Sequence, residues 1–228
     1  TITYTYDANG NLTEQAGRKT ASYSYDAENR LTKATVQSGN SVTIESYTYD
    51  YAGNRTSKTV NEDSTVYYVT DTSGSLAYVA AEMDADGKET ASYTRCDGEL
   101  MSMERSGEVW YYLYDGLGST RLLTNEAGRI TDKYAYDAYG SLLKKSGGTE
   151  NDFLYTGEQY NANTGLYYLR ARYMNPGTGT FISMDSYQGS LYDPISLHKY
   201  LYANANPVTY TDPSGYFSLP ELSAGMTM

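Results

Sequence analysis

Cysteine and histidine are almost missing from the 228-residue chain, which contains Cys96 and His198 and no other residue of either type. One cysteine excludes a disulfide-stabilised scaffold, and so few thiol and imidazole ligands exclude a structural zinc site. A Ser-His-Asp triad could use only His198, and no nucleophile elbow is present near it. We expect Cys96 to be a free, half-buried thiol.

Long apolar stretches and positive charge are also scarce. The longest purely apolar runs have about four residues, whereas a membrane-spanning helix needs about 20. Lys and Arg number 17 against 28 Asp and Glu, a net charge of −11, which disfavours binding to duplex nucleic acid because phosphates require a basic surface. No glycine-rich segment has a phosphate-loop pattern. Asp84 to Glu89 lacks the full spacing of a calcium loop. We therefore expect no metal, cofactor, nucleic acid or membrane span.

Tyrosine, in contrast, is abundant. The chain has 28 Tyr but only 3 Phe and 1 Trp. Disordered chains are poor in aromatic and β-branched residues, whereas Tyr, Thr, Val and Ile are enriched in β-strands. The composition predicts an all-β protein.

A repeated motif organises the first two thirds of the chain. Three copies read Tyr-x-Tyr-Asp, then two variable residues, Gly or Asn, and Asn or Arg: YTYDANGNL (4–12), YSYDAENRL (23–31) and YTYDYAGNR (47–55). The unit returns, with Ser at the last position, as YLYDGLGS (112–119) and YAYDAYGS (134–141), and degenerate copies lie at 71–74, 84–87 and 125–128.

Each copy predicts one β-hairpin. The Tyr-x-Tyr alternation places both rings on one face of a strand. Asp then begins a tight turn and Gly supplies the positive φ that the turn requires. Consecutive hairpins would extend one long sheet, in which we expect the tyrosine hydroxyls to remain hydrated. The alternative is an ordinary antiparallel sandwich whose Tyr-Asp turns are coincidental.

A second set of motifs fills the last third of the chain. In order they are FLYTGE (153–158), TGLYYLRARY (164–173), NPGTGTFISMD (175–185), NANPV (204–208) and DPSGY (212–216). Together with the Tyr-Asp repeats, this succession resembles the Rhs, or YD-repeat, family and its repeat-associated core domain. The resemblance covers nearly the whole chain.

The resemblance implies a fold and a domain order. In the family, the repeats form β-hairpins of a curved, spiralling sheet, part of a hollow cocoon-like shell, and the core domain plugs one end of the shell. Carried over to this chain, residues 1–145 are YD repeats, residues 146–216 are the core domain, and residues 217–228 are the stub of a variable C-terminal region.

The resemblance also implies a self-cleavage site. The family's core domain resembles an aspartic-type peptidase that cuts its own chain after the last DPxGL-like motif. Arg172, Asp185 and Asp212 match the catalytic positions, and the cut would fall between Tyr216 and Phe217. Two departures from the family pattern bear on this match. Ser rather than Pro follows Asp185, and the stretch 189–199 lengthens the spacing between the two aspartate motifs.

These three residues allow either a catalytic or a purely structural interpretation. Two carboxylates that share a proton can activate water and protonate a leaving group, and arginine can orient a carboxylate or polarise a carbonyl. Asp212-Pro-Ser-Gly is equally a type I turn, Asp185 could cap a turn, and Arg172 could be a buried ion-pair partner.

Two functions compete on these grounds. In the first, the chain is a shell fragment of an Rhs-type toxin. Its partners are its own enclosed C-terminal toxin, the upstream repeats and components of a secretion system, and it cleaves itself at most once. In the second, it is a structural or adhesive module, with carbohydrate binding as a variant. No signal peptide is visible in these residues, and the chain opens inside a repeat, so we expect a fragment of a longer bacterial protein that is secreted or displayed at the cell surface.

Overall fold

The protein consists almost entirely of β-strands, as the composition predicts. A computed structural model describes residues 1–17, 19–192, 194–216 and 219–220. Fourteen antiparallel strands form one sheet in which every strand pairs with its neighbours in the sequence. They are β1 (Thr3–Tyr6), β2 (Leu12–Ala16), β3 (Thr20–Tyr25), β4 (Leu31–Ser38), β5 (Ser41–Tyr49), β6 (Arg55–Val60), β7 (Ser64–Asp71), β8 (Tyr78–Met83), β9 (Glu89–Cys96), β10 (Glu99–Arg105), β11 (Glu108–Tyr114), β12 (Thr120–Asn125), β13 (Ile130–Tyr136) and β14 (Leu142–Ser146).

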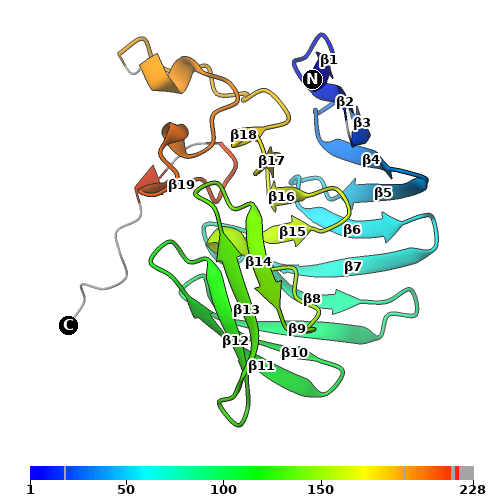
Figure 1. Ribbon diagram of the computed structural model, residues 1–228, viewed down its shortest axis with the longest axis vertical. Helices are drawn as coiled ribbons and strands as arrows, with labels where there is room; N and C mark the ends of the chain where they lie inside the picture. The colour runs from blue at the N-terminus through cyan, green and yellow to red at the C-terminus, as the bar shows by residue number, and fades with distance from the viewer. Residues whose placement is uncertain (18, 193, 217–218, 221–228) are drawn as a thin grey trace.

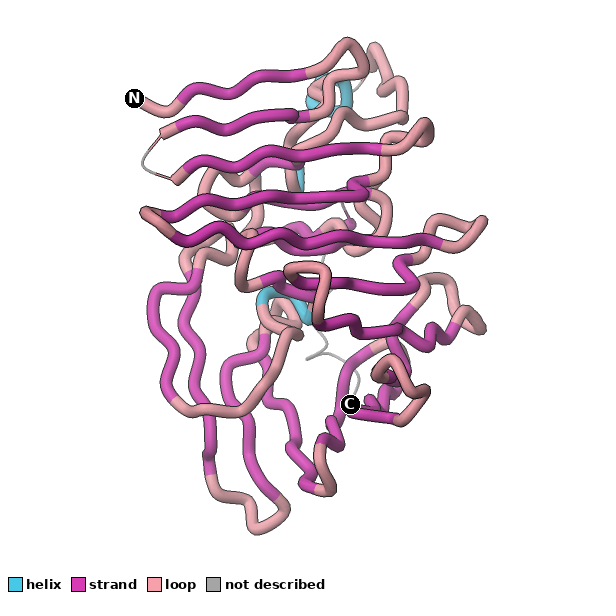
Figure 2. Tube along the Cα trace, turned by 90° about the vertical axis from the view of Figure 1, so that its right-hand side faces the viewer, coloured by secondary structure: helices cyan, strands magenta, loops and turns pink. Residues whose placement is uncertain are grey.

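The long sheet is curved, and the rest of the chain lies on its inner side (Figure 1). Seen from the side, its strands are stacked one above the next before the sheet bends round (Figure 2). The predicted curved sheet of hairpins is therefore confirmed. The inner segment contains a four-stranded and a two-stranded sheet, with three short 3₁₀ helices. They are β15 (Gln159–Asn161), β16 (Leu166–Leu169), β17 (Arg172–Asn175), β18 (Thr180–Phe181), β19 (Tyr210–Thr211), β20 (Leu219–Pro220), η1 (Tyr155–Gly157), η2 (Pro194–Leu197) and η3 (Ala203–Ala205).

The aspartate turns share one hydrogen-bond pattern. In each, a side-chain oxygen of the first residue accepts the backbone N–H groups two and four residues later, and the fourth residue has positive φ. This turn begins at Asp7, Asp26, Asp50, Asp84, Asp115, Asn125 and Asp137. The copy at 71–74 differs: Asp71 accepts only from Ser73, and Gly74 is not at positive φ.

A β-bulge accompanies every well-formed copy. The register shifts just before the second tyrosine of each Tyr-x-Tyr pair, and this tyrosine then faces the first residue of the return strand. The first tyrosine of the pair lies in the core in four of the five copies, at Tyr23, Tyr47, Tyr112 and Tyr134. The bulge thus keeps the inward face of each hairpin aromatic.

The second tyrosine joins one repeat to the repeat before it. The hydroxyl of Tyr25 donates to the carbonyl oxygen of Leu12 at 2.9 Å, and that of Tyr136 donates to Thr120 at 2.8 Å. Tyr49 donates to the carbonyl of Leu31 at 2.6 Å. The sequence suggested that these hydroxyls face water, whereas in the structure each of them bonds to a backbone carbonyl oxygen.

The first residue of a return strand also binds the inner segment. The N–H of Leu12 donates to the Ile182 carbonyl at 2.8 Å, and the N–H of Thr120 donates to the Leu154 carbonyl at 2.9 Å. The inner strands contribute to both apolar cores, one with the first repeats and one with the later strands. The inner segment is consequently attached both to the first repeats and to the later strands of the long sheet.

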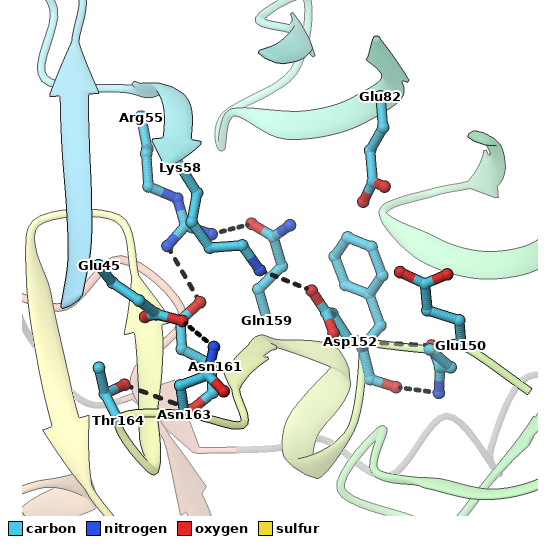
Figure 3. A network of polar contacts seen from close by, with 12 residues as sticks. Glu45, Arg55, Lys58, Glu82, Glu150, Asp152, Gln159, Asn161, Asn163 and Thr164 are labelled. Carbon is cyan, nitrogen blue, oxygen red and sulfur yellow. Dashed lines mark hydrogen bonds and ion pairs between the residues drawn. The ribbon is translucent and has the colours of Figure 1, made fainter. Parts of the chain in front are cut away.

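Polar contacts complete this attachment (Figure 3). Arg55 Nη2 donates to Gln159 Oε1 at 2.9 Å, and Lys58 forms an ion pair with Asp152 at 3.2 Å. The Arg55 guanidinium also lies 4.3 Å from the ring centre of Tyr168. Because Arg55 is only 2% exposed, these contacts form in a dry environment where each one is strengthened.

Neighbouring repeats provide a matched test of the tyrosine link. Tyr136→Phe removes the bond to Thr120 and should lower the free energy of unfolding by about 1 kcal/mol. Tyr114 occupies the equivalent position, but its buried hydroxyl has no hydrogen-bond partner among the described residues. Tyr114→Phe should therefore change stability by less than about 0.5 kcal/mol. Urea unfolding of the chain measures both, and equal losses would contradict the role of the Tyr136 bond.

Candidate functional site

The structure brings Arg172, Asp185 and Asp212 together. Arg172 Nη2 lies 2.8 Å from Asp185 Oδ2 and 3.6 Å from Asp212 Oδ2. The side chains are 5%, 13% and 2% exposed, respectively. The longer stretch at 189–199 does not separate the two aspartates, because one guanidinium bridges both carboxylates.

The position of Arg172 is fixed from several sides. It begins β17, and its guanidinium carbon lies 3.7 Å from the ring centre of Phe181 on β18. Its Nη1 donates to the Lys199 carbonyl at 3.2 Å, and the same carbonyl accepts the N–H of Asp185 at 2.9 Å. Phe181 and Lys199 therefore place Arg172 and Asp185 against each other, and neither was identified from the sequence.

Asp212 is the first residue of a turn and also a neighbour of Arg172. Its Oδ1 accepts the N–H of Gly215 at 2.8 Å and the hydroxyl of Ser214 at 3.1 Å, as expected for the first residue of a turn. Its Oδ2 faces Arg172. Gly215 has φ +74°, and a Cβ there would lie 2.3 Å from the Leu169 carbonyl oxygen. Glycine is required because the turn packs directly on the β16–β17 connection.

Three consecutive residues hold this turn by its carbonyl groups, and we call them the 170–172 clamp. A guanidinium N–H of Arg170 donates to Pro213, the N–H of Ala171 donates to Ser214 at 3.3 Å, and Arg172 Nε donates to Gly215. Sequence reasoning selected only Arg172, although Arg170 stands in the same motif.

Arg170 is itself held in place. Its Nη1 contacts both Glu158 carboxylate oxygens, at 2.9 and 3.0 Å, and its Nε donates to the Ala77 carbonyl at 2.8 Å. Ala77 directly precedes β8 of the long sheet. The clamp therefore ties the turn to the curved sheet.

The carboxylates and guanidinium lie in a low-dielectric environment. Burial raises the pKa of Asp212 to about 6, against the opposing effect of Arg172. Burial also lowers the pKa of Arg172, although both aspartates act in the other direction. Asp212 can therefore carry a proton near pH 6, while the close ion pair balances the negative charge of Asp185.

A cleft of about 650 Å³ opens beside these three side chains. Its wall includes His198 and Tyr216, and Tyr216 is 49% exposed. The predicted cut after Tyr216 thus begins at the cleft, whereas Phe217 lies outside the described residues. Arg172, Asp185 and Asp212 therefore line the same cleft as Tyr216.

The structure also bears on Cys96, on metal ligands and on membrane-spanning helices. Cys96 is free but exposed, so the expected half-burial is wrong. It ends β9 beside a tight turn, where little of the chain covers it. Among the described residues, no three His, Cys, Asp or Glu side chains are grouped so that they could hold a metal. No helix in the described part of the chain is long and apolar enough to cross a membrane.

A curved sheet of repeated hairpins with an inner segment defines a β-shell repeat protein. The family model of the teneurin YD-shell matches residues 1–208. The chain therefore belongs to the YD-shell family, which confirms its resemblance to the Rhs, or YD-repeat, proteins.

Named relatives and solved structures agree with this assignment. The chain is 40% identical to the tRNA3(Ser)-specific nuclease WapA of Bacillus spizizenii and 39% identical to the tRNA nuclease WapA of Bacillus subtilis strain 168. Each alignment covers 96% of this chain and 9% of the relative. It is 29% identical to salivary gland surface protein 1 of Aedes aegypti over 94% of this chain and 7% of that protein.

A crystal structure of TcdB2-TccC3 has the same fold, with a TM-score of 0.61 at 19% identity, covering 94% of this chain and 13% of that one. The chain thus spans less than a tenth of the length of these named relatives and 13% of the solved chain.

The raised pKa of Asp212 predicts a pH effect on stability. The folded protein keeps this proton to about pH 6, whereas an unfolded aspartate releases it near pH 4. Asp212 therefore contributes stability that is complete below about pH 4 and is lost as the pH rises through 6. Asp212→Asn removes this titration, so the variant should gain stability relative to the wild type, on the order of 2 kcal/mol, between about pH 4 and pH 7. Urea unfolding at both pH values measures the difference, and a constant difference would contradict the assignment.

Proposed function

We propose that the chain is the C-terminal part of a shell that encloses a toxin carried by the same polypeptide. Two relatives are named tRNA nucleases and another is named double-stranded DNA deaminase toxin A, while this chain matches only a minor part of each. In this proposal, residues 1–145 are shell repeats that continue from upstream ones, residues 146–216 are the core domain, and residues 217–228 lead into the toxin. The longer protein is secreted or displayed at the cell surface.

We further propose that the core domain cuts its own chain once, between Tyr216 and Phe217. One observation carries this proposal: a buried arginine holds two carboxylates near a single nitrogen, at the mouth of a cleft that also contains Tyr216. An arginine that served only as an ion-pair partner would not need to hold the carbonyl next to Tyr216 as well.

The geometry suggests a role for each residue. The 170–172 clamp holds the chain up to the Gly215 carbonyl, and in this proposal the peptide group after Tyr216 is positioned for attack beside the carboxylates. Asp185 accepts a proton from water as the water attacks the Tyr216 carbonyl carbon. Asp212, which retains its proton near pH 6, donates it to the leaving nitrogen of Phe217. The C–N bond breaks, and the products are a carboxylate at Tyr216 and a free amine at Phe217.

Cleavage in the longer parent protein tests the proposal. Asp185→Asn should preserve the fold and abolish the cut, because the amide keeps the size of the side chain but cannot take up the proton. Arg172→Lys should slow the cut strongly, since an ammonium cannot contact two carboxylates and a carbonyl at once. Intact mass of the products reports both the yield and the position of the cut.

Asp84→Asn is the control, because Asp84 starts an exposed hairpin turn of the long sheet. It should cleave normally, at a rate that does not depend on protein concentration. Normal cleavage in Asp185→Asn would remove the residue from the mechanism. A wild-type parent that stays intact would favour the structural or adhesive function instead, and binding to a glycan array would then test the carbohydrate variant.

A further inference from the structure

A small cavity lies where the long sheet meets the inner segment, away from the carboxylate pair. Its volume is about 30 Å³. Arg55 on β6, Arg95 on β9 and Arg170 of the clamp line it, and Glu158 is the only acidic residue in the lining. Three buried or half-buried cations therefore surround one cavity with a single carboxylate.

The positive charge in this lining is not balanced. Both oxygens of Glu158 bind Arg170. Within the described part of the chain, Arg55 and Arg95 form no ion pair; Arg55 bonds only to neutral oxygens such as Gln159 Oε1, and Arg95 Nη1 donates to the Gly98 carbonyl. An unpaired buried charge is costly, so the lining carries an excess of two positive charges at a high energetic cost.

Aromatic rings attract these cations but do not neutralise their charge. The guanidinium carbons of Arg95 and Arg170 lie 4.5 and 4.8 Å from the centre of the same ring, that of Tyr78. The two like charges also repel each other, and burial together with the charge of Arg170 lowers the pKa of Arg95. A negative charge in the cavity would offset this repulsion.

Unused hydrogen-bond donors surround the same cavity. Arg55 Nε, Arg95 Nε and Gln159 Nε2 are buried, and none has a hydrogen-bond partner among the described residues. Arg55 and Gln159 are 2% and 4% exposed. The Gln159 amide oxygen is turned toward Arg55, which leaves its nitrogen facing away (Figure 3). Water would also need acceptors for its own protons, but a halide accepts hydrogen bonds and donates none.

We propose that this cavity binds one small monovalent anion of the size of chloride, held by Arg55, Arg95 and Arg170. A cavity needs about 10–15 Å³ of such volume to hold one water molecule, so about 30 Å³ leaves room for a single halide ion. The anion joins β6 and β9 of the sheet to the residue that holds Pro213. It therefore stabilises the attachment of the inner segment, whether or not the chain cleaves itself.

Bromide replaces chloride and is visible by its anomalous scattering. Crystals of the protein soaked in sodium bromide should show one anomalous peak among the three guanidinium groups. The thermal midpoint of the full chain should rise by about 5 °C in saturating sodium chloride relative to sodium gluconate at equal ionic strength, because gluconate is too large for the cavity. An absent peak together with equal midpoints in the two salts would overturn the proposal.

Two variants separate anion binding from general salt effects. Arg95→Gln should weaken the response to chloride at least tenfold in midpoint concentration. Gln159→Glu places a fixed carboxylate against Arg55, so the variant should be as stable in gluconate as the wild type is in chloride and should no longer respond to chloride. Arg121→Gln changes a half-exposed arginine elsewhere on the sheet and should respond as the wild type does. A wild-type response in Gln159→Glu would exclude the cavity as the site.

Discussion

One residue at the start of each return strand must find hydrogen-bond partners outside its own hairpin. The bulge beside it displaces the strand ladder, and its backbone groups are buried, so they cannot rely on water. Leu12 and Thr120 solve this in the same way: each gives its N–H to the inner segment and accepts a tyrosine hydroxyl from the following repeat. In these two repeats the tyrosine of the following repeat thus supplies a hydrogen bond beside the bulge.

The same constraint explains why two residues of the candidate site are buried. The inner strands must lie against the sheet to accept the backbone N–H groups, and their own β16–β17 connection then packs on the turn at 212–215. This packing buries Asp212 and Arg172, and the burial shifts the pKa of both groups. The pKa shifts of Asp212 and Arg172 therefore follow from the packing of the inner segment against the long sheet.

Sequence patterns predicted much of this, and their failures have physical causes. The Tyr-x-Tyr-Asp repeat is local, so it predicted the hairpins and the curved sheet, and the ordered C-terminal motifs identified Arg172, Asp185 and Asp212. The degenerate copy at 71–74 does not form the same turn as the others, because Gly74 is not at the positive φ that those turns adopt. The roles of Arg55, Arg95 and Arg170 depend on contacts between residues as many as 118 positions apart, for which a sequence motif gives no signal.

The tyrosine link also has a direction along the chain. In each observed case the hydroxyl belongs to the later repeat and the carbonyl to the earlier one. In these three pairs of repeats, the carbonyl of the earlier hairpin can be bonded only after the tyrosine of the later repeat has been synthesised. The link needs no residue beyond the second repeat of the pair. A shell can therefore gain or lose whole repeats further along the chain without altering a link that has already formed.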